Sequence, residues 1–270
     1  MNLFDVSGKI VAVTGGAGVL GSNMGRYLAS QGAVVLIIDL NGEAAAAVAS
    51  EISAKGGQAA AFSANILKED EVKDLAEKIK AGFGQLDVLI NAAGGNVKGS
   101  SIEPGQQIFD VDFSMLKIAL DLNLVGTILP TIHLGRIMTL NKKGSIINIS
   151  SMAASSAITR VMGYSVAKAG IDSFTRWMAM EMAMKYGDAI RVNAIAPGFF
   201  IGNQNRDLLI NPDGSYTERA NKVIAKTPMG RFGRHDELNG LVHFLSSEAS
   251  SFVTGTVIPV DGGFSTFSGV

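Results

Sequence analysis

Residues 9–21 read Lys9-Ile10-Val11-Ala12-Val13-Thr14-Gly15-Gly16-Ala17-Gly18-Val19-Leu20-Gly21, and this stretch decides the fold. The apolar run up to Val13 is typical of a buried strand, and a helical pattern follows the glycines as far as Gln31. The glycines match the pattern Gly-x-Gly-x-x-Gly, in which a tight turn brings a dinucleotide pyrophosphate close to a helix N-terminus. Because such a match alone is a weak signal, the rest of the chain must support it.

A second apolar run, 34–38, supports it by ending in Asp39. An acidic residue at this place accepts hydrogen bonds from the adenosine ribose hydroxyls and repels a 2′-phosphate. Asp39 therefore predicts NAD in preference to NADP. The alternative is that Asp39 merely caps the turn Asp39-Leu40-Asn41-Gly42.

Apolar runs and helical periods alternate along the rest of the chain. Further strands are expected at 58–63, 86–90, 146–149, 190–195 and 255–260, and further helices at 43–55, 68–83, 112–140, 164–186 and 236–247. This alternation predicts one doubly wound α/β (Rossmann) domain, 1–270, with a seven-stranded parallel sheet. The stretch near 197–230 is the least regular part of the chain, and we interpret it as a substrate lid.

The composition narrows the possible functions. A chain of 270 residues that is 47% hydrophobic can bury one large core, and a net charge of −1 gives no electrostatic case for nucleic acid. Because cysteine is absent and the three histidines are scattered, we expect no disulfide, no thiol nucleophile and no metal. The N-terminus does not resemble a leader, and no apolar run reaches the roughly 20 residues that span a bilayer, so a cytoplasmic protein without a membrane partner is expected.

The candidate chemistry lies between Ser151 and Lys168. Tyr164 and Lys168 are four residues apart, so a helix places them on one face, where the ammonium favours the ionised phenol over its usual pKa of about 10. Tyr164 is then able to exchange a proton near neutral pH. Ser151 follows a buried strand, whose carboxyl end faces the ligand crevice of an open α/β sheet. The Tyr/Lys pair alone would equally fit a solvated helix face; Ser151 and the glycine-rich opening favour the catalytic interpretation.

Together these motifs resemble the short-chain dehydrogenase/reductase family along nearly the whole chain. The matching residues are Thr14-Gly15…Gly21, Asp39, Asn91-Ala92-Ala93-Gly94, Asn123, Ser151, Tyr164…Lys168, Asn193…Pro197-Gly198 and Asp261-Gly262-Gly263. The resemblance implies an NAD-dependent oxidoreductase acting on CH–OH groups, usually a homotetramer. It also implies four catalytic residues. Ser151 polarises the substrate carbonyl, Tyr164 is the acid/base, Lys168 holds the nicotinamide ribose and lowers the Tyr164 pKa, and Asn123 positions a water.

The same resemblance implies a set of cofactor-binding residues. They are Gly15, Gly18, Val19, Leu20, Gly21, Asp39, Leu40, Asn65, Ile66, Asn91, Ala92, Ala93, Tyr164, Lys168, Pro197, Gly198 and Phe200. The chain departs from the usual family pattern at three positions. Val19 stands at the middle glycine of the fingerprint, Gly202 where many members have Thr, and Asn65 where Asp is commoner.

Three short stretches, 15–21, 94–96 and 197–206, resemble a subgroup that acts on sugar acids, the D-mannonate oxidoreductases or fructuronate reductases. A hexuronate substrate needs a cation for its carboxylate and amides for its hydroxyls. The expected substrate residues are Asn96, Arg160, Asn203 and Arg206, with Lys98 as a secondary candidate. Each arginine could instead form an ordinary surface ion pair. Two other functions stay open, namely another sugar or polyol dehydrogenase such as a gluconate 5-dehydrogenase, and a protein that binds NAD without turnover.

Overall fold

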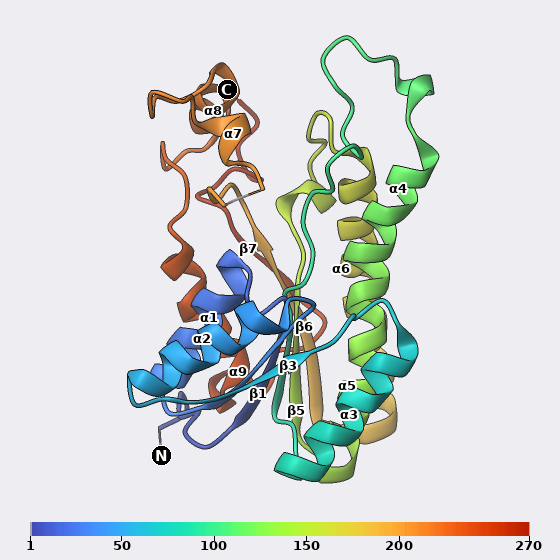
Figure 1. Ribbon diagram of the computed structural model, residues 1–270, viewed down its shortest axis with the longest axis vertical. Helices are drawn as coiled ribbons and strands as arrows, with labels where there is room; N and C mark the ends of the chain where they lie inside the picture. The colour runs from blue at the N-terminus through green and yellow to red at the C-terminus, as the bar shows by residue number, and fades with distance from the viewer. Residues whose placement is uncertain (1, 203, 270) are drawn as a thin grey trace.

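The strands form one parallel sheet in a computed structural model that describes residues 2–202 and 204–269. Their order is β3-β2-β1-β4-β5-β6-β7, so the sheet winds outward in both directions from β1 and β4 (Figure 1). The predicted fold class is confirmed. The strands are β1 (Ile10–Thr14), β2 (Val34–Asp39), β3 (Gln58–Ser63), β4 (Val88–Asn91), β5 (Gly144–Ile149), β6 (Ile190–Pro197) and β7 (Val257–Val260).

Helices cover both faces of the sheet (Figure 1). One face carries α1 (Val19–Ser30), α2 (Gly42–Ala54) and α9 (Asn239–Ser246), and the other carries α3 (Glu69–Phe83), α4 (Phe113–Leu120), α5 (Gly126–Asn141) and α6 (Met162–Tyr186). Short 3-10 turns lie at η1 (Ile108–Asp110), η3 (Met152–Ala154), η4 (His235–Leu238) and η5 (Glu248–Ser250). This layering follows from parallel strands, which need crossover helices on both sides.

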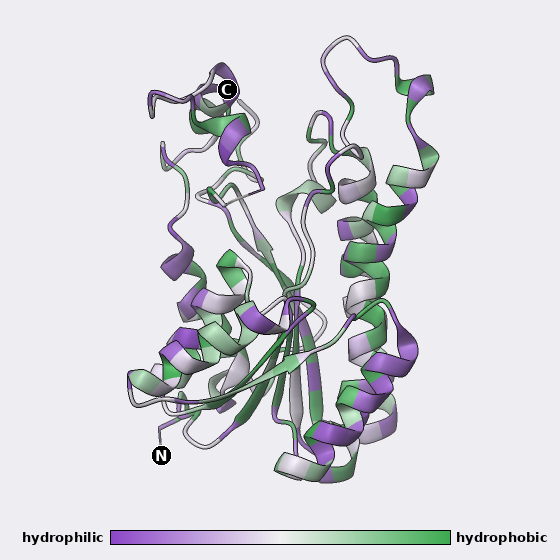
Figure 2. Ribbon diagram, viewed as in Figure 1, coloured by the Kyte–Doolittle hydropathy of each residue, from purple (hydrophilic) through white to green (hydrophobic). Residues whose placement is uncertain are grey.

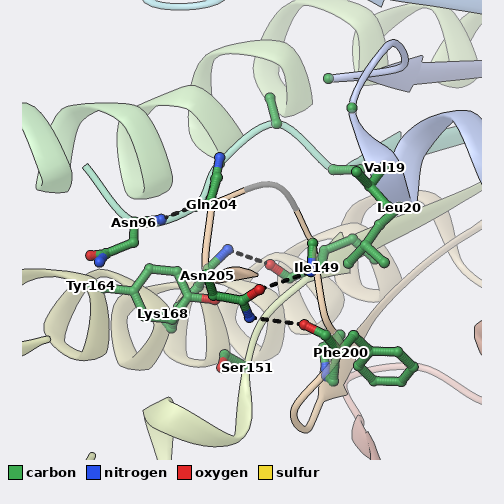
Figure 3. A pocket seen from close by; sticks show the side chains of 18 of the residues that line it. Val19, Leu20, Asn96, Ile149, Ser151, Tyr164, Lys168, Phe200, Gln204 and Asn205 are labelled. Atoms are coloured by element: carbon green, nitrogen blue, oxygen red, sulfur yellow. Dashed lines mark hydrogen bonds between the residues drawn. The ribbon is translucent and has the colours of Figure 1, made fainter. Parts of the chain in front are cut away.

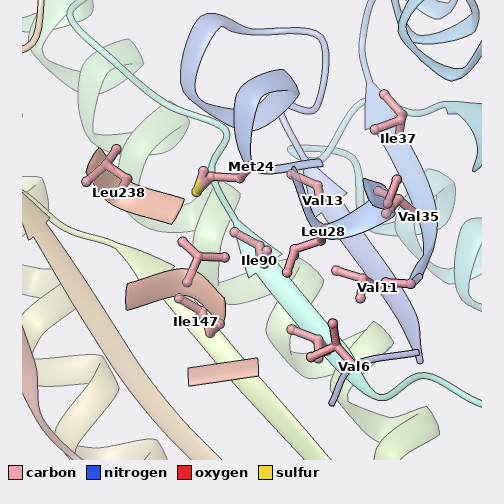
Figure 4. Close-up of a cluster of buried hydrophobic side chains, with 14 of the residues drawn as sticks. Val6, Val11, Val13, Met24, Leu28, Val35, Ile37, Ile90, Ile147 and Leu238 are labelled. Atoms are coloured by element: carbon pink, nitrogen blue, oxygen red, sulfur yellow. The ribbon is translucent and has the colours of Figure 1, made fainter. Parts of the chain in front are cut away.

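Each face of the sheet has its own apolar core. Figure 4 shows the first, in which Val11, Val13 and Ile37 of the sheet meet Met24 and Leu28 of α1. The second joins the opposite faces of the same strands to α3, α5 and α6. Alternate residues of a strand point to opposite faces, so a strand that feeds both cores reads as a continuous apolar run. The hydrophobic colouring of the strands in Figure 2 follows from this arrangement.

The long helical stretch predicted at 112–140 is interrupted in the structure. α4 and α5 are joined by η2 (Asp121–Val125), a π-helical turn that contains Asn123. The whole run Phe113–Asn141 is long and apolar enough to span a bilayer by length and composition, and 33% of its most apolar 18 residues are buried. It is not an uninterrupted apolar run, because Lys117, Asp121 and Arg136 lie within it. Here the run packs against α3 and α6 in one of the two helical layers.

The 197–230 segment is more ordered than its sequence predicts. It contains α7 (Arg206–Leu209) and α8 (Glu218–Lys226). The apolar sides of these two helices bury Leu209, Ala220 and Val223 in a small cluster with Phe232, separate from the two main cores. The segment thus has a core of its own, which lies beyond the carboxyl end of the sheet (Figure 1).

Candidate active site

A cavity of about 660 Å³ lies at the carboxyl ends of the strands. It is lined by the turn after β1, by Asp39 at the end of β2, by the loops after β4 and β5, by α6 and by the 197–230 segment. In a doubly wound sheet the ligand crevice lies at this edge, where the strand order reverses. Both predicted half-sites, the dinucleotide turn and the Ser/Tyr/Lys group, therefore open into one cavity.

The turn after β1 has the geometry that the fingerprint predicts. Gly15 has a φ of 62°, and a Cβ at Gly15 would lie 2.6 Å from the Cα of Ala93. A Cβ at Gly21 would lie 2.3 Å from the carbonyl oxygen of Gly15. Gly18 caps α1, whose first turn holds no acidic residue. Backbone packed this tightly at a helix N-terminus fits a pyrophosphate. Val19 is the first residue of α1 and lines the cavity, so this departure from the family pattern leaves the cradle in place.

Asp39 both caps the turn and lines the cavity. Its Oδ2 accepts a hydrogen bond from Ala17 N at 3.0 Å, and its Oδ1 accepts one from Asn41 N at 3.0 Å. A carboxylate has about four lone-pair sites, so two backbone bonds leave capacity for ribose hydroxyls. The two interpretations of Asp39 are compatible, and the residues present fit an adenosine ribose.

Ser151, Tyr164 and Lys168 line the other part of the cavity (Figure 3). β5 delivers Ser151, whose side chain caps η3 by accepting a hydrogen bond from Ala153 N at 3.1 Å. α6 carries Tyr164 and Lys168 one turn apart, and the Lys168 ammonium lies 5.4 Å from the centre of the Tyr164 ring. The buried Lys168 also donates to the carbonyl oxygen of Ile149 at 2.7 Å. Strand β5 therefore positions both ends of this group.

Burial governs the proton affinities of the two α6 residues. It raises the pKa of the Tyr164 phenol above its usual value, and the hydrogen bond with Ser151 opposes this shift. It also lowers the pKa of Lys168 to about 8, while the nearby Asp172 carboxylate opposes that change. Desolvation is the largest influence on the phenol, so its pKa is raised although Lys168 lies beside the ring, and the role of Lys168 in lowering that pKa stays a prediction. Lys168 alone therefore does not bring the pKa of the Tyr164 phenol below its usual value.

Asn123 is fully buried and does not line the cavity. Its side chain accepts from Gly95 N at 2.8 Å and donates to the carbonyl oxygen of Gly95 at 2.9 Å. The Asn123 amide thus fixes the loop after β4 from the side that faces away from the cavity. π-helical turns often occur at functional sites, and this one directs Asn123 toward that loop. In this geometry Asn123 is a positioning residue.

The structure brings together all but one of the predicted cofactor-binding residues. Asn91 is the exception, because its amide is buried and donates to Thr131 Oγ1 and Asn148 Oδ1, both at 2.8 Å. It ties β4 to β5 and does not reach the cavity. Asn65 lines the cavity despite replacing the commoner Asp, as does Gly202 at the usual Thr position.

Fewer of the predicted substrate residues line the cavity. Asn96 lines the cavity, whereas Arg160, Arg206 and Lys98 do not. Arg160 pairs with Glu103 and donates to the carbonyl oxygen of Ile102 at 3.0 Å, and Arg206 is exposed on α7. Asn203 lies outside the described residues.

The sequence analysis missed several residues that line the cavity, among them the polar side chains of Gln204, Arg219 and His235. Gln204 lies in a stretch that resembles the subgroup, which is a signal that could have identified it. Arg219 and His235 carry no such signal, because only the packing of α8 and η4 turns them inward. Within 2–202 and 204–269, no group of three or more His, Cys, Asp or Glu residues could hold a metal ion.

Known proteins are similar to this chain in fold and in sequence. The family model for enoyl-(acyl carrier protein) reductase matches residues 15–265. A crystal structure from Haemophilus influenzae, provisionally assigned as a D-mannonate oxidoreductase and holding NAD, is 42% identical with a TM-score of 0.93, over 98% of each chain. A gluconate 5-dehydrogenase from Burkholderia cenocepacia, in complex with NADP and tartrate, is 29% identical with a TM-score of 0.87, over 98% of each chain.

A relative named for a sugar-acid dehydrogenase has an intermediate sequence identity. The 2-dehydro-3-deoxy-D-gluconate 5-dehydrogenase of Formosa agariphila is 35% identical over 97% of this chain and 95% of its own. The predictions of family, of enzyme class and of a nicotinamide cofactor are confirmed by these matches and by the cavity geometry. The chain belongs to the short-chain dehydrogenase/reductase family and is an oxidoreductase.

Proposed function

We propose that the protein is an NAD(H)-dependent oxidoreductase that interconverts a keto-sugar acid and its hydroxy form, with D-fructuronate and D-mannonate as the pair. The observation that carries this proposal is one cavity with Asp39 among its cofactor-facing residues and Ser151, Tyr164 and Lys168 among the rest. The sugar-acid class is supported by relatives named for mannonate and for gluconate derivatives.

The residues divide the chemistry between them. NADH, when bound, supplies the hydride that reduces the carbonyl carbon. The Ser151 hydroxyl donates a hydrogen bond to the carbonyl oxygen, and the Tyr164 phenol donates the proton that this oxygen needs to become a hydroxyl. In the oxidising direction Tyr164 takes the proton back. The Lys168 ammonium lies beside the ring and stabilises negative charge on the phenol oxygen.

A substrate and cofactor panel tests this proposal. NADH consumption is followed with D-fructuronate, 5-keto-D-gluconate and uncharged ketoses, and each reaction is repeated with NADPH. We expect D-fructuronate with NADH to give the highest kcat/KM, because the Asp39 carboxylate repels a 2′-phosphate. Higher efficiency with NADPH would contradict the role of Asp39, and fluorescence enhancement of NADH without consumption would indicate a non-catalytic binding protein.

A second candidate is a 5-dehydrogenase of gluconate or of a deoxygluconate. Relatives with these names support it and share the fold over nearly their whole length. The same panel separates the two, since this candidate predicts 5-keto-D-gluconate as the best substrate.

The assembly and location belong to the same proposal. We propose a cytoplasmic homotetramer, as the family resemblance implies. Large apolar side chains stay exposed along α4, α5 and α6, including Phe113, Ile132, Trp177 and Met184. Exposed apolar surface of this kind is typical of subunit contacts. Light scattering at several protein concentrations tests the tetramer.

The 197–230 segment is proposed as the lid over the cavity.

A further inference from the structure

Among the residues that the structure describes, one lysine and one arginine line the cavity, Lys168 and Arg219. Lys168 belongs to the catalytic group, because its ammonium donates to the Ile149 carbonyl oxygen and lies over the Tyr164 ring. Arg219 has no assigned role. A positively charged side chain that has no other role in a substrate cavity indicates that the substrate carries a negative charge.

Arg219 is held in place by neutral partners. Its Nη1 donates to Thr159 Oγ1 at 3.0 Å, and its Nη2 donates to the Thr159 carbonyl oxygen at 3.3 Å. Within the described chain no carboxylate pairs with it, and both burial and the neighbouring Arg160 charge lower its pKa. A guanidinium has five N–H donors, so donors remain for a ligand.

Arg160 provides the contrast. Its guanidinium is neutralised by Glu103 and does not line the cavity. Two arginines thus meet at one edge of the site, and only the one that faces the cavity lacks a counter-charge. A half-buried cation of this kind is stabilised when a bound anion replaces the missing partner.

The position of Arg219 is fixed from both sides. Arg219 lies in the first turn of α8, which Thr217 caps. Ala220, the residue that follows Arg219, is fully buried in the small cluster. On the opposite side Thr159 belongs to the loop that joins Ser151 to Tyr164. The guanidinium therefore links the 197–230 segment to the loop between Ser151 and Tyr164.

Asn96 also lines the cavity. Its Nδ2 donates to Ser101 Oγ at 2.9 Å, which fixes the orientation of the amide. Its Oδ1 is buried and has no hydrogen-bond partner. A ligand in the cavity does not reach a buried oxygen, so Arg219 remains the group that is available to a substrate anion.

We propose that Arg219 binds the carboxylate of the substrate. This assignment rests on the proposed function and makes it more specific. It replaces Arg160 and Arg206 as the cation that selects an acid over a neutral sugar.

The test compares Arg219→Gln with Arg206→Gln as a matched control on the exposed side of the same segment. With D-fructuronate and NADH, we expect Arg219→Gln to raise KM by about 10- to 100-fold, the range for loss of a charged hydrogen bond. The KM of an uncharged ketose should change less than threefold, and Arg206→Gln should leave both unchanged. NADH affinity, measured by fluorescence, should stay at the wild-type value in all variants. Arg219→Lys, which keeps the charge, should recover part of the loss.

The outcomes separate the two levels of the proposal. If the wild type reduces D-fructuronate and Arg219→Gln alters both substrate classes equally, the Arg219 assignment is overturned while the function stands. If the wild type reduces neutral ketoses and no sugar acid, both fall. If no substrate is reduced, calorimetric titration of the protein–NADH complex with D-mannonate decides. Binding that Arg219→Gln abolishes supports the assignment, and binding that it leaves intact, or no binding, overturns it.

Discussion

The β5–α6 region and the 197–230 segment face each other across the cavity but are built differently. In the first, Ser151 and Lys168 are buried, and Asn148 bridges β4 to α6 through hydrogen bonds with Asn91 and Thr175. In the second, a cluster of four buried residues supports two short helices with mostly exposed polar side chains. Buried, paired polar groups resist displacement, whereas few apolar contacts allow local opening.

This difference suggests a division of labour. We expect the β5–α6 region to hold the reacting groups in a buried, hydrogen-bonded framework, and the segment opposite to supply contacts that select the substrate. Substitutions in the first should therefore reduce turnover, and substitutions in the second should alter apparent affinity. The following predictions test this contrast.

Tyr164→Phe should have the largest effect. Removing the hydroxyl deletes the proton donor, so kcat should fall by at least ~10²-fold, the usual contribution of one positioned acid/base. NADH affinity should stay near the wild-type value, because the ring remains in place. Stopped-flow turnover and fluorescence titration measure the two quantities. Near-normal turnover would remove Tyr164 from the mechanism.

Asp172→Asn should have an intermediate effect through Lys168. The Asp172 carboxylate accepts a hydrogen bond from Ser150 and raises the pKa of Lys168, which burial lowers to about 8. Lys168 loses its positive charge above that pKa, so kcat/KM should decline on the alkaline side of about pH 8. Without the Asp172 charge the Lys168 pKa falls further, and the alkaline limb should move to lower pH.

The pH profile distinguishes this effect from a general loss of structure. A destabilised variant would lose activity at every pH, whereas a changed Lys168 pKa moves the limb. Asp188→Asn, at an exposed carboxylate just beyond α6, is the matched control and should keep the wild-type profile. An alkaline limb that stays in place, or moves upward, in Asp172→Asn would show that Asp172 does not act on Lys168.

The same contrast explains what the sequence could predict. The order and approximate limits of the strands were predictable because parallel strands buried on both faces read as apolar runs. Ser151, Tyr164 and Lys168 were predictable because helical and strand periodicities determine which way they face.

The two arginines at the edge of the cavity were harder to assign from the sequence. Arg160 and Arg219 both follow polar or turn-like residues, and only the tertiary contacts with Glu103 and Thr159 separate them. The raised Tyr164 pKa was also hidden, since burial depends on the whole fold. Sequence reasoning therefore predicted the group of Ser151, Tyr164 and Lys168 that the structure brings together, whereas neither predicted arginine lines the cavity.

Gln204→Ala should have the smallest effect and tests how loosely the segment is held. Asn96 N donates to Gln204 Oε1 at 3.1 Å (Figure 3). The exposed glutamine lies so close to Gly95 that a Cβ at Gly95 would overlap the Gln204 amide. One exposed hydrogen bond contributes about 0.5–1.5 kcal/mol at most. We therefore expect KM for the sugar acid to rise by about two- to fivefold, kcat to change less than twofold, and the unfolding midpoint in urea to stay within error. A loss of kcat comparable to that of Tyr164→Phe would mean that the segment positions the reacting groups, and the division between the two regions would not hold.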